Sequence, residues 1–169
     1  MREFSLVHEM DATVDGYWRA FFDPAYEKAV VAALRFRQYD AIEHEETETE
    51  IHRKTRAVPR LDAAAALAKL FGTSFGYIEE GRFDKATRIW RTHTVPDTLS
   101  GRMSFDMVMR VEPGRLDTTC KRTLEFRIEA RVRGVAGMFE SGLEKSLRAG
   151  WAESTAFLND WLRKASRSA

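Results

Sequence analysis

The first residue in this sequence with a side chain suited to chemistry is His8. It alternates with Phe4, Leu6 and Met10 in a segment whose other face is polar, so the imidazole is predicted to lie on the apolar face of a strand. A buried imidazole could orient a ligand hydroxyl or carboxylate group, or act as a general base near neutral pH. It could equally be a core histidine that is hydrogen-bonded to a neighbouring side chain.

Arg122 lies in phase with the apolar residues Cys120, Leu124 and Phe126 in a later alternating segment. Its guanidinium group could bind an anionic head group, or it could reach water from the end of the strand. Cys120 is predicted to act as a small buried hydrophobic residue. Asp106 is the acidic residue that we consider as an internal group for proton transfer.

A charged hairpin is predicted in the first half of the chain. If its strands turn about Glu48, His44 lies opposite His52 and Glu46 opposite Glu50, and this set could bind a divalent ion. A slip of one residue in the register separates the set. The alternative, which we favour, is a solvated hairpin with charge pairs across the strands. We therefore expect no metal site and no cofactor.

Composition narrows the class of protein. The 169 residues suffice for one domain over 1–169, and a net charge of +1 gives no field that would attract nucleic acid. The single cysteine excludes a disulfide-rich scaffold and a zinc site with several thiolates. No signal peptide or membrane span is recognisable, so a cytoplasmic protein is expected. Basic residues interleaved with acidic ones indicate a solvated face, with transient contact to a membrane surface as the alternative.

Hydrophobic periodicity predicts the elements that must position these residues. Alternating residues predict a strand over 4–10, a hairpin over 36–58 and four strands over 74–83, 86–95, 102–111 and 116–133. Helical spacing predicts two short helices between Val14 and Leu34 that are interrupted at Pro24, a helix over 61–71 and a long helix over about 135–164. Alternation in the later strands is typical of an antiparallel sheet with one buried face.

The candidate walls of a cavity are the methionine-rich strand predicted over 102–111 and the apolar stripe of the long helix. Methionine is flexible and polarisable, so it suits a wall that adapts to an apolar ligand, although it also fills gaps in ordinary cores. Met10 and Met138 could join this wall. Gly142 and Gly150 lie inside the long helix and suggest either a close approach or an open space on that face. No phosphate-binding glycine loop, His-Glu-x-x-His, nucleophile elbow or Cys-x-x-Cys motif is present.

The order of elements resembles the START-like helix-grip superfamily, which includes relatives of the birch pollen allergen, polyketide cyclase-like proteins and lipid-transfer domains. The closest likeness is to a group of uncharacterised bacterial START-like proteins. They carry an extra helix like Arg60–Gly72 after a prolyl turn like Val58-Pro59, and a tryptophan in the middle of the sheet like Trp90. The resemblance implies an α+β fold in which a strongly curved antiparallel sheet of six to seven strands wraps around the C-terminal helix. It also implies a cavity for an apolar ligand.

From these observations we expect a protein that binds or carries a lipid, sterol or polyketide-like molecule, without any residue assigned to catalysis. Two alternatives stay open: an enzyme of the cyclase or hydrolase kind that uses His8 or Asp106, and a regulatory module that binds a protein partner. The residues expected to line the cavity are Leu6, His8, Met103, Phe105, Met107, Arg122, Leu124, Phe126, Phe139, Leu143 and Trp151.

Overall fold

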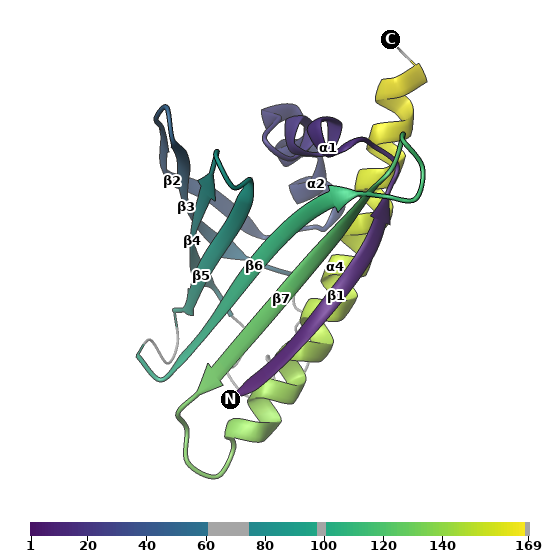
Figure 1. The fold of residues 1–169 in the computed structure, drawn as a ribbon. Helices are drawn as coiled ribbons and strands as arrows, with labels where there is room; N and C mark the ends of the chain where they lie inside the picture. Colours follow the sequence, from purple (N-terminus) through teal and green to yellow (C-terminus); the bar gives the residue numbers. More distant parts are fainter. Residues whose placement is uncertain (61–74, 98–100, 168–169) are drawn as a thin grey trace.

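The computed structural model describes residues 1–60, 75–97 and 101–167. In this part of the chain, seven strands form one antiparallel sheet and three helices pack against it (Figure 1). The strands are β1 (Arg2–Met10), β2 (Gln38–Glu46), β3 (Glu50–Val58), β4 (Tyr77–Asp84), β5 (Ile89–Pro96), β6 (Met103–Pro113) and β7 (Cys120–Ala130). The helices are α1 (Val14–Phe21), α2 (Pro24–Ala33) and α4 (Ala136–Arg167). The helix predicted over 61–71 lies outside the described residues.

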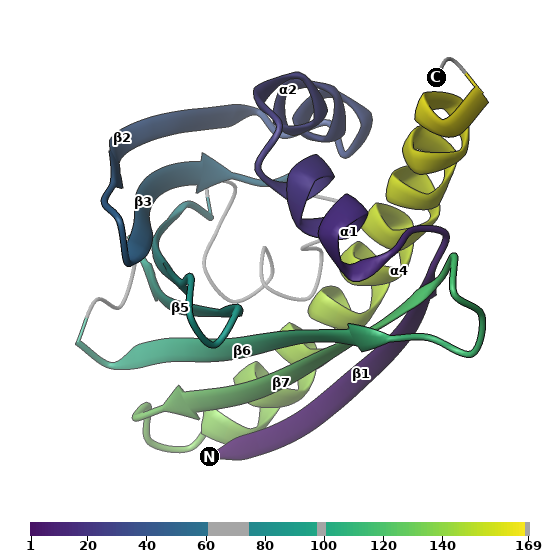
Figure 2. The same cartoon turned by 45° about the horizontal axis from the view of Figure 1, so that its top comes forward.

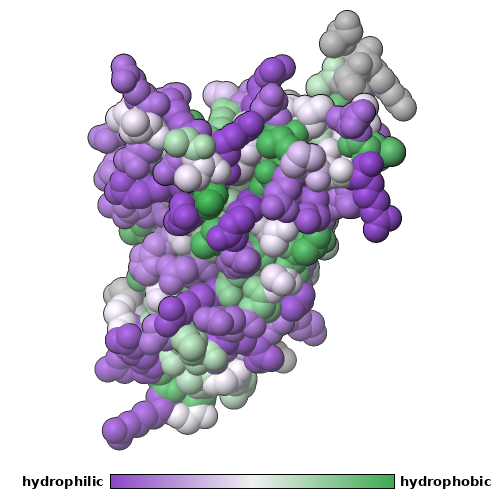
Figure 3. All heavy atoms as spheres, viewed as in Figure 1, coloured by the Kyte–Doolittle hydropathy of each residue, from purple (hydrophilic) through white to green (hydrophobic). Residues whose placement is uncertain are grey.

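The sheet is a run of antiparallel neighbours in the order β1-β7-β6-β5-β4-β3-β2. Strand β1 closes one edge by pairing with β7, which places Leu6 opposite Leu124 and His8 opposite Arg122. Seen from its end, the sheet curls around a central space, and α4 runs along the concave side (Figure 2). This arrangement confirms the predicted α+β helix-grip architecture. Hydrophilic residues predominate on the face of the molecule that is seen from outside β6 and β7 (Figure 3).

Local capping explains why two short helices follow β1. The Thr13 hydroxyl accepts a hydrogen bond from the Gly16 N–H at 3.1 Å, which caps α1. The Asp23 carboxylate accepts from the Ala25 N–H at 2.8 Å, and Pro24 occupies the first position of α2. These helices cover one end of the curled sheet (Figure 2).

Helix α4 is fastened to β1 at both ends. Near its beginning, Glu140 forms an ion pair with the amino group of Met1 at 2.7 Å. Near its end, Asn159 donates to the Glu9 carbonyl oxygen at 3.3 Å and accepts from the Asp11 N–H at 3.0 Å. Because β1 is itself hydrogen-bonded to β7, these contacts hold the helix against one side of the concave face and leave the opposite strands farther from it.

Two apolar clusters form the core, one toward each end of α4. The first lies under α1 and includes Trp18, Trp90 and Leu124, and the second includes Met103 and Phe139. Gly81 allows the indole of Trp90 to lie across β4, since a Cβ at position 81 would overlap the benzene ring of that indole. Met10 is fully buried in the first cluster. Met138, which we considered for the cavity wall, is instead 58% exposed because it lies on the solvent side of α4.

None of the described helices combines the length and the apolar character that crossing a bilayer requires.

Candidate functional site

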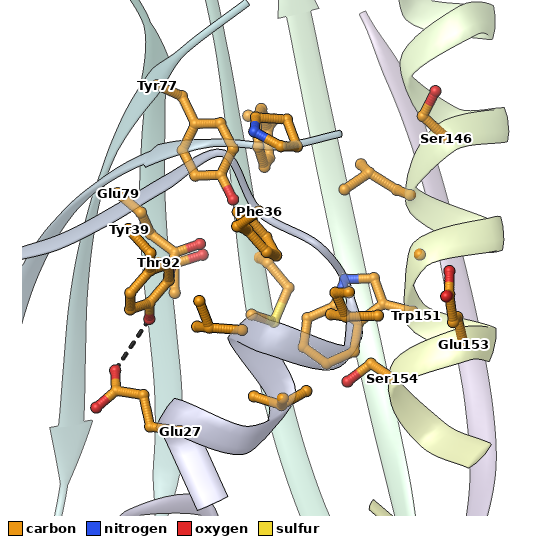
Figure 4. Close-up of a pocket in the computed structure, with 18 of the residues that line it drawn as sticks. Glu27, Phe36, Tyr39, Tyr77, Glu79, Thr92, Ser146, Trp151, Glu153 and Ser154 are labelled. Carbon is orange, nitrogen blue, oxygen red and sulfur yellow. Dashed lines mark hydrogen bonds between the residues drawn. The ribbon is translucent and has the colours of Figure 1, made fainter. Parts of the chain in front are cut away.

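A cavity of about 290 Å³ lies between the concave face of the sheet and α4. Side chains from the strands and from α4 approach it from opposite sides, and α2 covers one end (Figure 4). Most of its wall is apolar. The apolar lining residues are Phe21, Val30, Val31, Leu34, Phe36, Pro59, Phe75, Trp90, Phe105, Met107, Phe126, Leu143, Leu147 and Trp151.

One face of α4 forms the helical wall of the cavity. Leu143, Leu147, Gly150 and Trp151 line it and repeat at spacings of three and four residues, which places them on the same side of the helix. Apart from its own helix backbone and chain neighbours, a Cβ atom at Gly150 would have no atom of the described residues within 4 Å. The glycine therefore leaves open space on the cavity side of the helix, which is one of the two interpretations that the sequence suggested.

The sheet side of the cavity carries a group of polar side chains. Tyr39 donates a hydrogen bond from its hydroxyl group to Glu27 Oε1 at 3.0 Å (Figure 4). Arg53 lies 3.5 Å from the same carboxylate oxygen and 5.1 Å from the ring centre of Trp90. Burial raises the pKa of Glu79, and the positive charge of Arg53 opposes this rise. The polar group thus contains one paired acid, Glu27, and one acid with a raised pKa, Glu79.

Arg122 is the centre of a second polar group, next to the helical wall. Its Nη1 donates to the Tyr17 hydroxyl at 3.3 Å, and its Nη2 donates to His8 Nδ1 at 3.2 Å and to Thr155 Oγ1 at 2.5 Å. The guanidinium carbon lies 4.9 Å from the ring centre of Trp151. Burial and the positive charge of Arg122 lower the pKa of His8 to about 4, so His8 is neutral at pH 7 and accepts the hydrogen bond through Nδ1.

Some of the residues predicted to line the cavity do so. Phe105, Met107 and Phe126 contribute to the wall from β6 and β7, and Leu143 and Trp151 contribute from α4. Arg122 also lines the cavity, although only 1% of its surface is exposed. Contact of these residues with a ligand remains a prediction.

The remaining predicted lining residues lie elsewhere in the core. Leu6 and His8 are on β1, against which α4 packs directly, so they are not on the cavity wall. Leu124 is fully buried in the cluster under α1, and Met103 and Phe139 fill the cluster at the other end of the sheet. Alternation in the strands and helical spacing at Phe139 correctly indicated an inward direction for these side chains. Periodicity could not indicate where along the concave face the helix makes contact.

The polar residues from β2, β3 and β4 were missed, because the hairpin over 36–58 was interpreted as a solvated part of the sheet. Its inner face is in fact covered: Thr55 and Ala57 are buried, and Tyr39 and Arg53 line the cavity. A signal was available in the next strand, where Glu79 shares its phase with Phe83, a residue of the buried cluster.

The residues considered for proton transfer and for metal binding do not form a site in the structure. Asp106 is not internal: its side chain is half exposed on the outer face and lies 2.7 Å from the Nδ1 atom of His93. In the hairpin, His44 pairs with Arg53 and Glu45 with His52, because a bulge between Ala41 and Glu43 shifts the register. The alternative in which two histidines and two glutamates face each other across the hairpin is therefore wrong. No cluster of three potential metal ligands occurs within the described ranges.

Cys120 is fully buried, as predicted. Burial raises the pKa of its thiol to about 11, so the reactive thiolate form is disfavoured at neutral pH. The residue therefore acts as a small core side chain.

Residues 5–162 match the protein family described as "Protein of unknown function (DUF2505)". The chain belongs to this family. No curated protein matches the DUF2505 sequence.

Solved structures show what this DUF2505 chain resembles in fold. The protein TTHA0849 from Thermus thermophilus is 13% identical and superposes with a TM-score of 0.70, over 98% of this chain and 99% of that chain. The Zhui aromatase/cyclase from a Streptomyces species is 14% identical, with a TM-score of 0.62 over 98% and 94% of the two chains. A START superfamily protein from Mycobacterium smegmatis is 11% identical, with a TM-score of 0.63 over 95% and 98%. At these identities the likeness establishes the START-like helix-grip fold and nothing about activity.

Proposed function

We propose that this DUF2505 protein binds or carries a hydrophobic small molecule in the cavity between its sheet and α4. The observation that carries the proposal is the open space beside Gly150, within a wall that is mostly aromatic and aliphatic. A volume of about 290 Å³ lies near the lower end of the range for small-molecule pockets, which is roughly 300–1,000 Å³. The fold shared with an aromatase/cyclase and a START superfamily protein supports the proposal by analogy.

Transfer of an apolar molecule into this space requires no catalytic group. Burial of each methylene group contributes about 0.8 kcal/mol, so a short alkyl chain or a small ring system would bind with useful affinity. Met107 offers an adaptable wall, and Phe105, Phe126 and Trp151 offer flat apolar surfaces. We expect these side chains to contact the bound molecule.

The direct test is a titration with N-phenylnaphthylamine, an uncharged dye whose fluorescence increases in apolar surroundings. We expect saturable binding and displacement of the dye by decanol. Native mass spectrometry of the freshly purified protein would detect an apolar molecule that accompanies it from the cell. Absence of saturable dye binding, together with a mass equal to that of the bare chain, would contradict the proposal.

A second candidate function, proton transfer on a ligand in the same cavity, is favoured by Glu79 and Tyr77. Both line the cavity (Figure 4), and burial raises the pKa of the Glu79 carboxyl group and of the Tyr77 phenol, which favours proton retention by each group. If the protein is an enzyme, Glu79→Gln should abolish turnover and retain dye binding. Equal turnover in this variant and the unmodified protein would remove the candidate.

A further inference from the structure

We propose that the ligand of this cavity is an amphiphile with a single carboxylate group, and that Arg122 is the counter-ion of that group. The inference rests on the proposed binding function and names the class of ligand. It starts from a charged side chain that is almost completely buried at the cavity wall.

Arg122 has no acidic partner in the part of the chain that the structure describes. Each atom that accepts a hydrogen bond from it is neutral: the Tyr17 hydroxyl, His8 Nδ1 and the Thr155 hydroxyl. Arg53, a partly buried arginine on the sheet side of the cavity wall, pairs with Glu27. An arginine cannot lose its proton at physiological pH, so the group around Arg122 retains a full positive charge.

The guanidinium group also has unused hydrogen-bond donors. Of its five N–H bonds, those on Nη1 and Nη2 supply the three hydrogen bonds above, whereas Nε, which is buried, has no partner among the residues that the structure describes. Buried donors without partners and buried charges without counter-ions are both unfavourable. A carboxylate oxygen would satisfy the donor and compensate the charge in one step, in surroundings where charge-assisted hydrogen bonds are strong.

The tyrosine and threonine hydroxyl groups already have other acceptors, so they do not compete for the ligand. Tyr17 donates to Met109 Sδ at 3.2 Å, and Thr155 donates to the Trp151 carbonyl oxygen at 2.6 Å. Within this polar group, Arg122 is therefore the donor that remains for a ligand. Its position beside Trp151 places the charge next to the apolar wall of α4, as an amphiphile requires.

The acidic residues around the cavity argue for a single negative charge. Glu27 and Glu79 lie in the polar group on the sheet side, and the exposed Glu153 lies at the rim. A group with two charges, such as a phosphate monoester, would bring a second negative charge to a wall that already carries these acidic residues, whereas Arg122 supplies one positive charge. A carboxylate matches the single charge of Arg122.

The experiment compares decanoic acid with decanol, which differ in the head group alone, by displacement of N-phenylnaphthylamine at neutral pH. We expect the unmodified protein to bind decanoate about tenfold more tightly than decanol, or more. Equal affinity, or a preference for decanol, would overturn the inference while leaving the proposed function intact. Failure of both compounds to bind would instead contradict the proposed function.

Two variants test whether Arg122 causes the preference for decanoate. Arg122→Met keeps much of the length of the side chain and removes its charge, and it should reverse the preference in favour of decanol. Arg127→Met is the matched control, because Arg127 is on the same strand with its side chain exposed to solvent, and it should keep the preference for decanoate. If Arg122→Met retained the preference, the inference would be wrong.

A measurement on the unmodified protein covers the case in which Arg122→Met does not fold. In nitrogen-15 NMR spectra, the Nε–H resonance of Arg122 should move downfield on addition of decanoate and stay in place on addition of decanol. An Nε–H resonance that responds equally to both compounds would overturn the inference without any substitution.

Discussion

Filling the cavity from α4 should raise stability and weaken binding at the same time. Leucine at position 150 adds about four carbon atoms on the cavity side of the helix, where a Cβ atom would have no neighbour within 4 Å in the described part of the chain. Replacing glycine in a helix interior contributes about 0.5–1 kcal/mol from helix propensity alone. Packing of the new side chain against Leu147 and Trp151 adds about 1 kcal/mol. We therefore expect Gly150→Leu to raise Tm by roughly 5 °C, at about 2–4 °C per kcal/mol for a chain of this size.

The same leucine takes the place of part of the ligand. If it displaces about four ligand carbons at about 0.8 kcal/mol each, the loss is about 3 kcal/mol, or about a hundredfold in affinity. The assay is thermal unfolding followed by circular dichroism, together with titration of N-phenylnaphthylamine. Gly137→Leu is the matched control, because Gly137 is on the same helix, its Cβ would also have no neighbour, and it lies outside the cavity. The control should bind the dye like the unmodified protein.

Two outcomes would refute this reasoning. A stabilised Gly150→Leu protein with unchanged dye affinity would show that the ligand does not occupy the space beside Gly150. A clearly destabilised protein would show that this space is not open, since a leucine would then have to displace its neighbours.

Further predictions concern stability. Gly81→Ala should lower the free energy of unfolding by about 2 kcal/mol in urea titrations, because the methyl group overlaps Trp90, which is buried and cannot move aside; an unchanged midpoint would contradict this packing. The pKa of His8 is lowered to about 4 from 6.5, so as pH falls through this window the unfolded chain takes up a proton that the folded chain refuses, and stability decreases. His8→Gln should remove that part of the pH dependence, whereas substitution of the exposed His93 by Gln should keep it. Tyr39→Phe should destabilise the protein by about 1 kcal/mol in the same urea titrations, because Glu27 loses a hydrogen bond.

The sequence was sufficient to predict the architecture because its signals are local. Alternation in the strands and three-to-four spacing in α4 are properties of single elements, and the caps at Thr13 and Asp23 are set by residues within one turn. Only the element order was needed to place them in a helix-grip fold. The burial of Cys120 followed from its phase in β7.

The site was predicted only in part, because a cavity depends on distances between elements. Phase indicated that Leu124 and Phe126 both point inward, but only Phe126 reaches the open space, whereas Leu124 is covered by the cluster under α1. The register of the β2–β3 hairpin depends on a bulge between Ala41 and Glu43, and no turn residue in the sequence indicates that bulge. Glu79 and Tyr39 could not be assigned to a cavity wall without knowing how far the sheet curls.

The pairing of β1 with β7 has a consequence for synthesis of the chain. His8 and its partner Arg122 are separated by 114 positions, so β1 leaves the ribosome well before β7, the strand with which it pairs. During that interval the consecutive hairpins from β2 onward can assemble, but α4 has not yet been synthesised and the apolar concave surface stays uncovered. Nascent chains of this protein should therefore engage chaperones until the final helix has emerged.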